Sequence, residues 1–299
     1  MTVSPERQRS QRPGLLARHP LVSFFVMAYA FTWIVWTPWV LGADGAGLLP
    51  IRIDPGAVGY LNAAAILAGP TVAGLIMTGV CEGRAGIRRL LARLVLWRVG
   101  VRWYVVALVG VPLIMLLGTM VYAGTLPALG ALGGPSYLLS YVVSFVLVTI
   151  LGGPLFEEIG WRGFALARMQ RSLGPLGASL VLGVLWALWH LPEFLVPSWA
   201  ASSGGGGLSG IVLFTLTAIT FTVVITWVFN NTRASVLLAV LVHSSIDTFT
   251  GTLAAIFPPE AVASAFPYMI GFGAVALVLV AVTRGRLSHR RLEETVDAR

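Results

Sequence analysis

The sequence predicts an all-α, polytopic membrane protein with about eight transmembrane helices, and three observations support this class. Of its 299 residues, 57% are hydrophobic and only 11% are charged, whereas soluble domains carry about 25% charged residues. The apolar residues gather in runs of about 20, the length that crosses the hydrocarbon core of a bilayer. All 20 basic residues are arginines, and they fall between these runs or at the ends of the chain.

Eight apolar runs are expected to form the crossing helices. The first is too long for the core of a signal peptide and lacks a small-residue cleavage site, so we expect it to be retained as a helix. Each of the others is also near the length that a bilayer requires. The runs are Leu21–Leu41, Ala57–Val80, Val101–Ala123, Tyr137–Phe156, Leu176–Val196, Gly210–Phe229, Ser235–Ile256 and Phe266–Val282.

The arginines predict the topology. With the N-terminus in the cytoplasm, eight crossings place 19 of the 20 arginines in cytoplasmic segments and only Arg52 outside, as the positive-inside tendency requires. We therefore expect a multi-pass protein of the cell (plasma) membrane with both termini in the cytoplasm. Its parts are a basic N-terminal tail at 1–20, a membrane domain at 21–283 and a C-terminal tail at 284–299.

The basic charge points to the bilayer as partner and not to nucleic acid. The net charge is +8, but the arginines follow the loops between apolar runs instead of forming one patch. Six of them alternate with apolar residues in the segment Arg84–Trp103. This segment is either a basic amphipathic helix on the cytoplasmic leaflet or a charged linker between two spans.

Ionisable residues inside apolar runs are the candidate functional residues, because charge near hydrocarbon is costly. Glu157 lies about 16 residues before the turn at 172–175 and His190 about 16 after it, so both lie roughly 24 Å from that turn along their helices. His243 and Asp247 lie about 11 and 15 residues into the seventh helix, roughly 17–23 Å along it. These groups are therefore expected to share one layer of the membrane.

The two adjacent acids are expected to have different partners. Glu158 and Arg162 are four residues apart with the acid first, the better order for a helical ion pair, and this pair could be purely structural. Glu157 points about 100° away from it and is left for another task. Gly152-Gly153-Pro154 interrupts the fourth run just before the acids, and such a loosened backbone is tolerated where protein or water satisfies it.

The two histidines each have a neighbour four residues away on the same helix face. The Trp186 ring can pack against the imidazole of His190. The Asp247 carboxylate can fix the tautomer of His243 or pair with its charged form. A single buried histidine is more often hydrogen-bonding glue between helices than a catalyst, but five ionisable groups at one height favour a functional site.

Three ordered motifs resemble a known family. Glu157-Glu158-Ile159-Gly160-Trp161-Arg162 matches E-E-x-x-x-R, Trp186-Ala187-Leu188-Trp189-His190 resembles F-x-x-x-H with Trp for Phe, and His243-Ser244-Ser245-Ile246-Asp247 matches H-x-x-x-(N/D). In this order they resemble the CPBP family (CAAX protease and bacteriocin-processing, also called Abi) of intramembrane glutamic endopeptidases. The resemblance covers about residues 135–255 and implies a helical membrane fold with an active-site chamber open to the cytosol.

The resemblance also implies roles for the acids and histidines. It implies hydrolysis of a peptide bond near the C-terminus of a lipidated (CAAX-like) or membrane-bound protein or peptide. Glu157 would be the general base that activates water, with help from His190. His243 and the residue at 247 would stabilise the oxyanion. An asparagine at 247 would donate a hydrogen bond naturally, so Asp247 is a departure and is expected to orient His243 instead.

The remaining expectations concern positioning and substrate. By the same resemblance, Arg162 would orient the acids through Glu158. We also expect Trp161 and Trp186 to contribute to substrate binding, and we expect no cofactor.

Two alternatives from other classes stay open. Two glutamates and two histidines are chemically adequate ligands for zinc, although the spacing lacks H-E-x-x-H and the single cysteine, Cys81, has no partner for a metal site. A non-enzymatic transporter, scaffold or immunity protein could use the same intramembrane acids. Inverted repeats would favour transport, and the sequence shows no internal repeat.

Overall fold

The structure, a computed structural model, describes residues 14–289, and within that range it contains helices and loops but no strand. Seven helical segments of the described chain are long and apolar enough to cross a membrane. They are Pro20–Val40, Pro55–Leu94, Val101–Ala123, Pro154–Trp189, Gly207–Asn231, Val236–Ile256 and Phe266–Thr283. The all-α, polytopic membrane class is thereby confirmed. The predicted tails fall largely outside the described residues, and the count of eight crossings stays a prediction.

The crossing segments are assembled from shorter elements, three of which are π-helical turns: η1, η2 and η4. Their bounds are α2 (Pro20–Val40), α3 (Pro55–Ile66), η1 (Leu67–Thr71), α4 (Val72–Leu94), α5 (Val101–Val105), η2 (Val106–Gly110), α6 (Val111–Ala123), α8 (Pro154–Gly160), η4 (Trp161–Leu166), α9 (Ala167–Trp189), α11 (Gly207–Asn231), α12 (Val236–Ile256) and α14 (Phe266–Thr283). The remaining elements are α1 (Leu15–Arg18), η3 (Leu129–Leu132), α7 (Pro135–Leu151), η5 (Leu191–Leu195), α10 (Pro197–Ser202) and α13 (Pro259–Val262).

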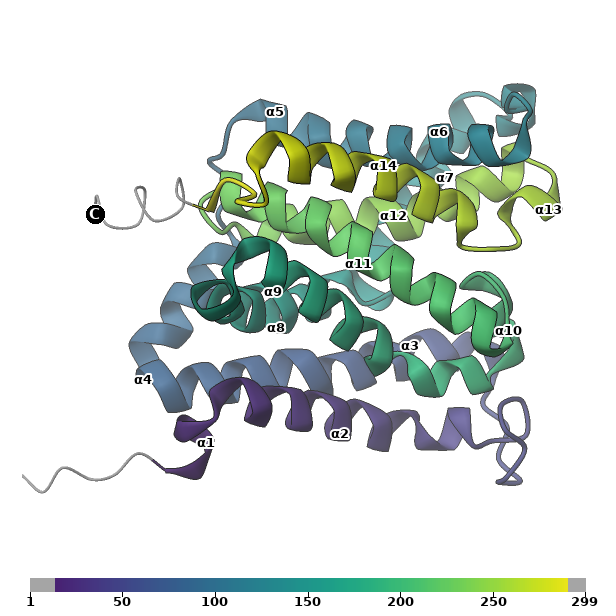
Figure 1. The fold of residues 1–299 in the computed structure, drawn as a ribbon. Helices are drawn as coiled ribbons and strands as arrows, with labels where there is room; N and C mark the ends of the chain where they lie inside the picture. The colour runs from purple at the N-terminus through teal and green to yellow at the C-terminus, as the bar shows by residue number, and fades with distance from the viewer. Residues whose placement is uncertain (1–13, 290–299) are drawn as a thin grey trace, which may run out of the picture.

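The long helices lie side by side and run back and forth between two ends of one bundle (Figure 1). The beginning of the described chain at α1 and the segment after α14 lie at the same end, on the left of the view. Helices α10 and α13 lie at the opposite end. The most buried crossing segment is α12, which packs against α6, α7, α8 and α11. Side chains on α12 therefore reach the centre of the bundle.

The fourth predicted span differs from the structure. Instead of one helix over 137–156, α7 ends at Leu151 and α8 begins at Pro154. Gly153 between them has φ 122°, a backbone conformation that side-chain-bearing residues rarely adopt. Proline suits the first position of a helix because its missing N–H has no partner there. The two acids therefore lie in the first turns of a new helix and not at the end of a crossing helix.

Two other glycines mark bends that the sequence expected as loops. Gly174, with φ 67° and ψ 170°, breaks the helical geometry of α9 within the predicted turn at 172–175. Gly83 does the same in α4. The segment after Gly83 is helical to Leu94 and not helical at 95–100, so Arg84–Trp103 combines a shorter basic helix with a linker, and neither of the two alternatives describes all of it.

Close backbone packing holds the acid-bearing helix against η1. A Cβ placed on Gly160 would lie 2.3 Å from the carbonyl oxygen of Pro70, so a larger residue does not fit at this contact. The hydroxyl of Thr71 donates a hydrogen bond to the carbonyl of Phe156 at 2.5 Å. These contacts fix where α8 starts and hence the height of the acids in the bundle.

Candidate active site

The structure brings the predicted ionisable residues together from three segments, α8 with η4, the end of α9, and α12. All but Asp247 are withdrawn from solvent. Their exposed fractions are 3% for Glu157, 0% for Glu158, 0% for Arg162, 8% for His190 and 3% for His243. Arg162, which the topology count placed with the cytoplasmic arginines, is therefore an internal residue of this cluster.

Glu158 links α8 to α12. Its Oε1 accepts a hydrogen bond from Nη1 of Arg162 at 2.8 Å and one from Nδ1 of His243 at 2.9 Å. The predicted ion pair between Glu158 and Arg162 is thus present, with both side chains 0% exposed. A carboxylate oxygen can only accept here, so Nδ1 of His243 carries the hydrogen. Glu158 holds the orientation of the His243 ring.

Asp247 has a weaker contact than expected. Its Oδ2 lies 3.7 Å from Nε2 of His243, and its side chain is 34% exposed. This separation is too long for a hydrogen bond. Glu158, not Asp247, is therefore the hydrogen-bond partner that orients the His243 ring, while Asp247 lies within ion-pair distance of Nε2, and its pairing with a charged His243 stays a prediction. Asp247 instead lies beside the space that Nε2 faces.

Two indoles hold the carboxylate of Glu157. Its Oε2 accepts a hydrogen bond from Nε1 of Trp186 at 2.6 Å and one from Nε1 of Trp161 at 3.2 Å. Trp161 is 0% exposed and Trp186 is 7% exposed. Both were expected to touch substrate, but their polar atoms are directed at Glu157. Sequence reasoning missed this role, and the four-residue spacing of Glu157 and Trp161 was the available signal.

Gly153 leaves space beside the other oxygen of the same carboxylate, Oε1, that a side chain would fill. A Cβ on Gly153 would lie 2.7 Å from Oε1 of Glu157 and 2.8 Å from Cδ1 of Ile66. The carbonyl of Gly153 also accepts a hydrogen bond from the backbone N–H of Glu157 at 2.9 Å. The glycine is therefore required both by its positive φ and by the closeness of the carboxylate.

His190 is held in position by Trp186. Its Nδ1 donates a hydrogen bond to the backbone carbonyl of Trp186 at 2.8 Å, which leaves Nε2 for another partner. Its ring lies edge-on to Trp186 at 4.9 Å and is stacked on Trp199 at 5.9 Å between centroids. Trp186 therefore contacts both Glu157 and His190, so one residue sets the position of two candidate catalytic groups.

A further carboxyl lies near this cluster. Glu193, in η5, is 2% exposed and lies within electrostatic range of Glu157. The sequence placed Glu193 at an outer helix end without a role. Its burial could not be read from the sequence, because it depends on how η5 folds back onto the end of α9.

An apolar cavity of about 440 Å³ adjoins the site. It is bounded by α3, α7 and α10, with Asn62, Leu147, Gly152 and Trp199 among its lining residues. Trp199 is the ring stacked on His190, and Gly152 directly precedes Gly153. The cavity thus lies next to the groups that surround Glu157, and its lining suits an apolar chain.

The arrangement does not resemble a zinc centre. Within residues 14–289, no group of three or more histidine, cysteine, aspartate or glutamate side chains is placed so that it could hold a metal ion. Two of the donors that the zinc alternative needs, Glu158 and His243, are hydrogen-bonded to each other.

Comparison with known proteins gives two matches. Residues 138–249 match the family model described as Type II CAAX prenyl endopeptidase Rce1-like. The chain is also 29% identical over 136 residues to CAAX prenyl protease 2 of Methanococcus maripaludis, a stretch that covers 45% of this chain and 49% of that protein. The chain thus spans about half the length of the curated relative it matches. The six candidate catalytic residues, from Glu157 to Asp247, all lie within the matched residues 138–249.

Proposed function

We propose that the protein is an intramembrane glutamic endopeptidase of the CPBP family, which its three motifs resemble and which the match of residues 138–249 to the Rce1-like CAAX prenyl endopeptidase model supports. It hydrolyses a peptide bond near the C-terminus of a lipidated, CAAX-like, or membrane-bound protein. The observation that carries the proposal is the carboxylate of Glu157, buried and held through one oxygen by two indoles. A carboxylate fixed in this way has its second oxygen, Oε1, available for a water molecule.

The first step uses Glu157 as general base. A water molecule gives a proton to Oε1 of Glu157, and its oxygen attacks the carbonyl carbon of the scissile bond. Nε2 of His190, left free because Nδ1 bonds the backbone, accepts a hydrogen bond from the second O–H of that water and so orients it without taking the proton. The protonated Glu157 then gives its proton to the leaving nitrogen as the C–N bond breaks.

The oxyanion faces His243. Because Nδ1 of His243 already donates to Glu158, Nε2 can donate to the oxyanion only when the ring is an imidazolium. The carboxylate of Glu158 and the nearby Asp247 are suited to hold that positive charge. A preorganised donor in a site shielded from water stabilises the developing negative charge strongly.

The adjoining cavity is the proposed site for a lipid chain on the substrate. Its apolar lining by α3 and α7 suits a prenyl or acyl chain, and the peptide end of the substrate would then extend toward Glu157. A chain anchored there supplies binding energy that orients the scissile bond.

The test uses the purified protein in lipid nanodiscs with a farnesylated peptide ending in a CAAX sequence. Mass spectrometry of the products should show one cut near the C-terminus of the lipidated peptide, with at least about tenfold slower cutting of the unlipidated one. Strong chelators should leave the rate unchanged. Inhibition by chelators that added zinc reverses would support the metalloprotease alternative. Absence of any cleavage with folded protein would favour the non-enzymatic scaffold.

A further inference from the structure

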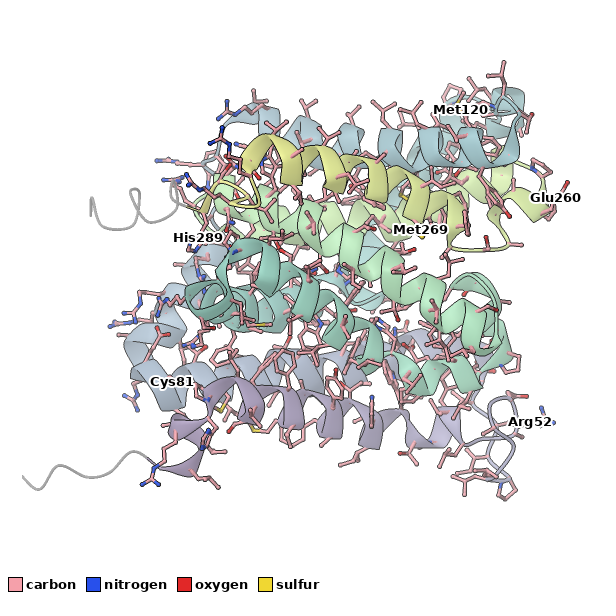
Figure 2. The ribbon with its side chains drawn as sticks, in the orientation of Figure 1. Arg52, Cys81, Met120, Glu260, Met269 and His289 are labelled. Atoms are coloured by element: carbon pink, nitrogen blue, oxygen red, sulfur yellow. The ribbon has the colours of Figure 1, made fainter. Side chains whose placement is uncertain are left out.

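A second cavity, of about 590 Å³, lies away from the candidate active site. It is formed by α5 and η2, by the last turn of α11, and by the end of α14 with the residues after it. These elements meet at the end of the bundle where α1 also lies (Figure 1). Figure 2 shows side-chain nitrogen atoms gathered at this end near His289, while Arg52 lies at the opposite end.

Two arginines from different segments line this cavity, and the guanidinium of one, Arg102, lies 5.3 Å from the centroid of the Trp103 ring. Arg102 comes from α5, and Arg286 comes from the segment after α14. Neither takes part in any of the ion pairs found within residues 14–289. Asn231 and Ser288 add polar side chains to the same lining. Guanidinium groups match the geometry of phosphate oxygens and bind them with strong, charge-assisted hydrogen bonds.

The rest of the lining is apolar. Trp103 and Trp227 meet edge to face with their centroids 4.9 Å apart, and Val106 and Val282 complete this part of the lining. Val282 is 78% exposed on the outside of the bundle, where a membrane protein meets lipid tails. The lining therefore combines groups that suit an anion with groups that suit hydrocarbon, as expected near a membrane surface, where tryptophan rings are common.

The segment after α14 is held in place by a buried leucine. Leu287 is 0% exposed and packs against Val223 and Ala276. Its carbonyl accepts a hydrogen bond from Nδ2 of Asn230 at 3.0 Å, and its N–H donates to Oγ1 of Thr283 at 3.1 Å. Because Leu287 is anchored, the backbone of its neighbours Arg286 and Ser288 is held beside the cavity that both residues line, and the Arg286 side chain remains exposed.

We propose that this cavity binds the headgroup of an anionic glycerophospholipid. The phosphate lies between Arg102 and Arg286, and the acyl chains run along the exposed faces of η2 and α14. Free phosphate shares the headgroup chemistry but would leave the tryptophan and valine part of the cavity without a ligand. The proposal goes beyond the proteolytic activity and uses none of the candidate catalytic residues.

The test measures lipid binding to the delipidated full-length protein by native mass spectrometry. The probes are dioleoyl-phosphatidylglycerol, dioleoyl-phosphatidylethanolamine and inorganic phosphate. The wild type should bind one phosphatidylglycerol in preference to phosphatidylethanolamine, and millimolar phosphate should not displace it. Arg102→Gln/Arg286→Gln should weaken this binding by roughly tenfold or more. The control Arg84→Gln/Arg88→Gln removes the same charge from exposed residues of α4 outside the cavity and should bind as the wild type does.

Thermal unfolding gives a second readout that does not depend on the mass spectrometer. Phosphatidylglycerol should raise the unfolding temperature of the wild type and the control but not of the cavity variant, because only a ligand bound to the folded state stabilises it. If the double variant fails to fold, Arg102→Gln and Arg286→Gln are compared singly. Equal loss in the control, unchanged binding in the cavity variants, or displacement by free phosphate would each overturn the proposal.

Discussion

Replacing Arg162 with methionine should lower the free energy of unfolding by about 3–5 kcal/mol, the usual loss when one partner of a buried ion pair is removed. Arg162 and Glu158 are both 0% exposed, with Nη1 and Oε1 2.8 Å apart. The guanidinium also lies 5.7 Å and 5.6 Å from the ring centroids of Trp186 and Phe221. Without it, the Glu158 carboxylate keeps one hydrogen bond, from His243, but loses its permanent positive charge.

A double-mutant cycle shows how much of this loss in the free energy of unfolding comes from leaving the Glu158 charge unpaired. Arg162→Met/Glu158→Gln removes both charges, so it should recover a large part of the stability lost in Arg162→Met. Its hydrolytic activity should not recover, because His243 then faces a neutral amide where the structure has a carboxylate. A recovery of stability without activity separates the electrostatic balance of the cluster from its chemistry.

Unfolding by denaturant in mixed detergent micelles measures both effects. Arg89→Met is the matched control, since Arg89 pairs with Glu82 at 2.8 Å but is 63% exposed, and exposed pairs contribute less than about 1 kcal/mol. If Arg162→Met costs no more than Arg89→Met, the ion pair is not the buried support described above. A double variant that is no more stable than Arg162→Met would likewise show that the unpaired Glu158 charge is not the cause of the loss.

Three further changes test other parts of the account. Gly153→Ala should slow hydrolysis at least about tenfold, because the added Cβ would lie 2.7 Å from Oε1 of Glu157; a wild-type rate would show that this contact is not needed. Asp247→Asn should change the rate by less than about fivefold, since Glu158 remains as the hydrogen-bonded carboxylate of His243 and an amide at 247 can donate to the oxyanion; a hundredfold loss in a pH–rate profile would show that Asp247 is the main partner of the charged His243 ring. Reporters fused at Gly205 and at the C-terminus should lie on opposite sides of the membrane, and finding them on one side would refute the topology.

Much of the fold follows from the sequence because crossing a bilayer requires long apolar helices, which composition reveals. The break between α7 and α8 was visible as Gly152-Gly153-Pro154, but its consequence was not. Spacing alone could not show that the acids begin a new helix, because the positive φ of Gly153 depends on packing against Ile66 and Glu157.

The sequence predicted which residues form the site, but not all of the contacts between them. The ion pair of Glu158 and Arg162 lies within one helix, so four-residue spacing was sufficient. The hydrogen bond between His243 and Glu158 was missed, because it depends on how α8 and α12 are rotated toward each other, whereas Asp247 lies on the same helix as His243. The cavity lined by Arg102 and Arg286 is formed by residues from separate helices, so no motif in the sequence indicates it.

The most direct test of the central claim compares the hydrolysis rates of wild type and Glu157→Gln on one farnesylated peptide, with equal amounts of folded protein. The amide oxygen of glutamine can still accept the indole hydrogen bonds of Trp161 and Trp186, so the unfolding temperature should stay the same. Glutamine cannot take a proton from water, so the rate should fall at least about 100-fold. A rate near that of the wild type would contradict the assignment of Glu157 as the base.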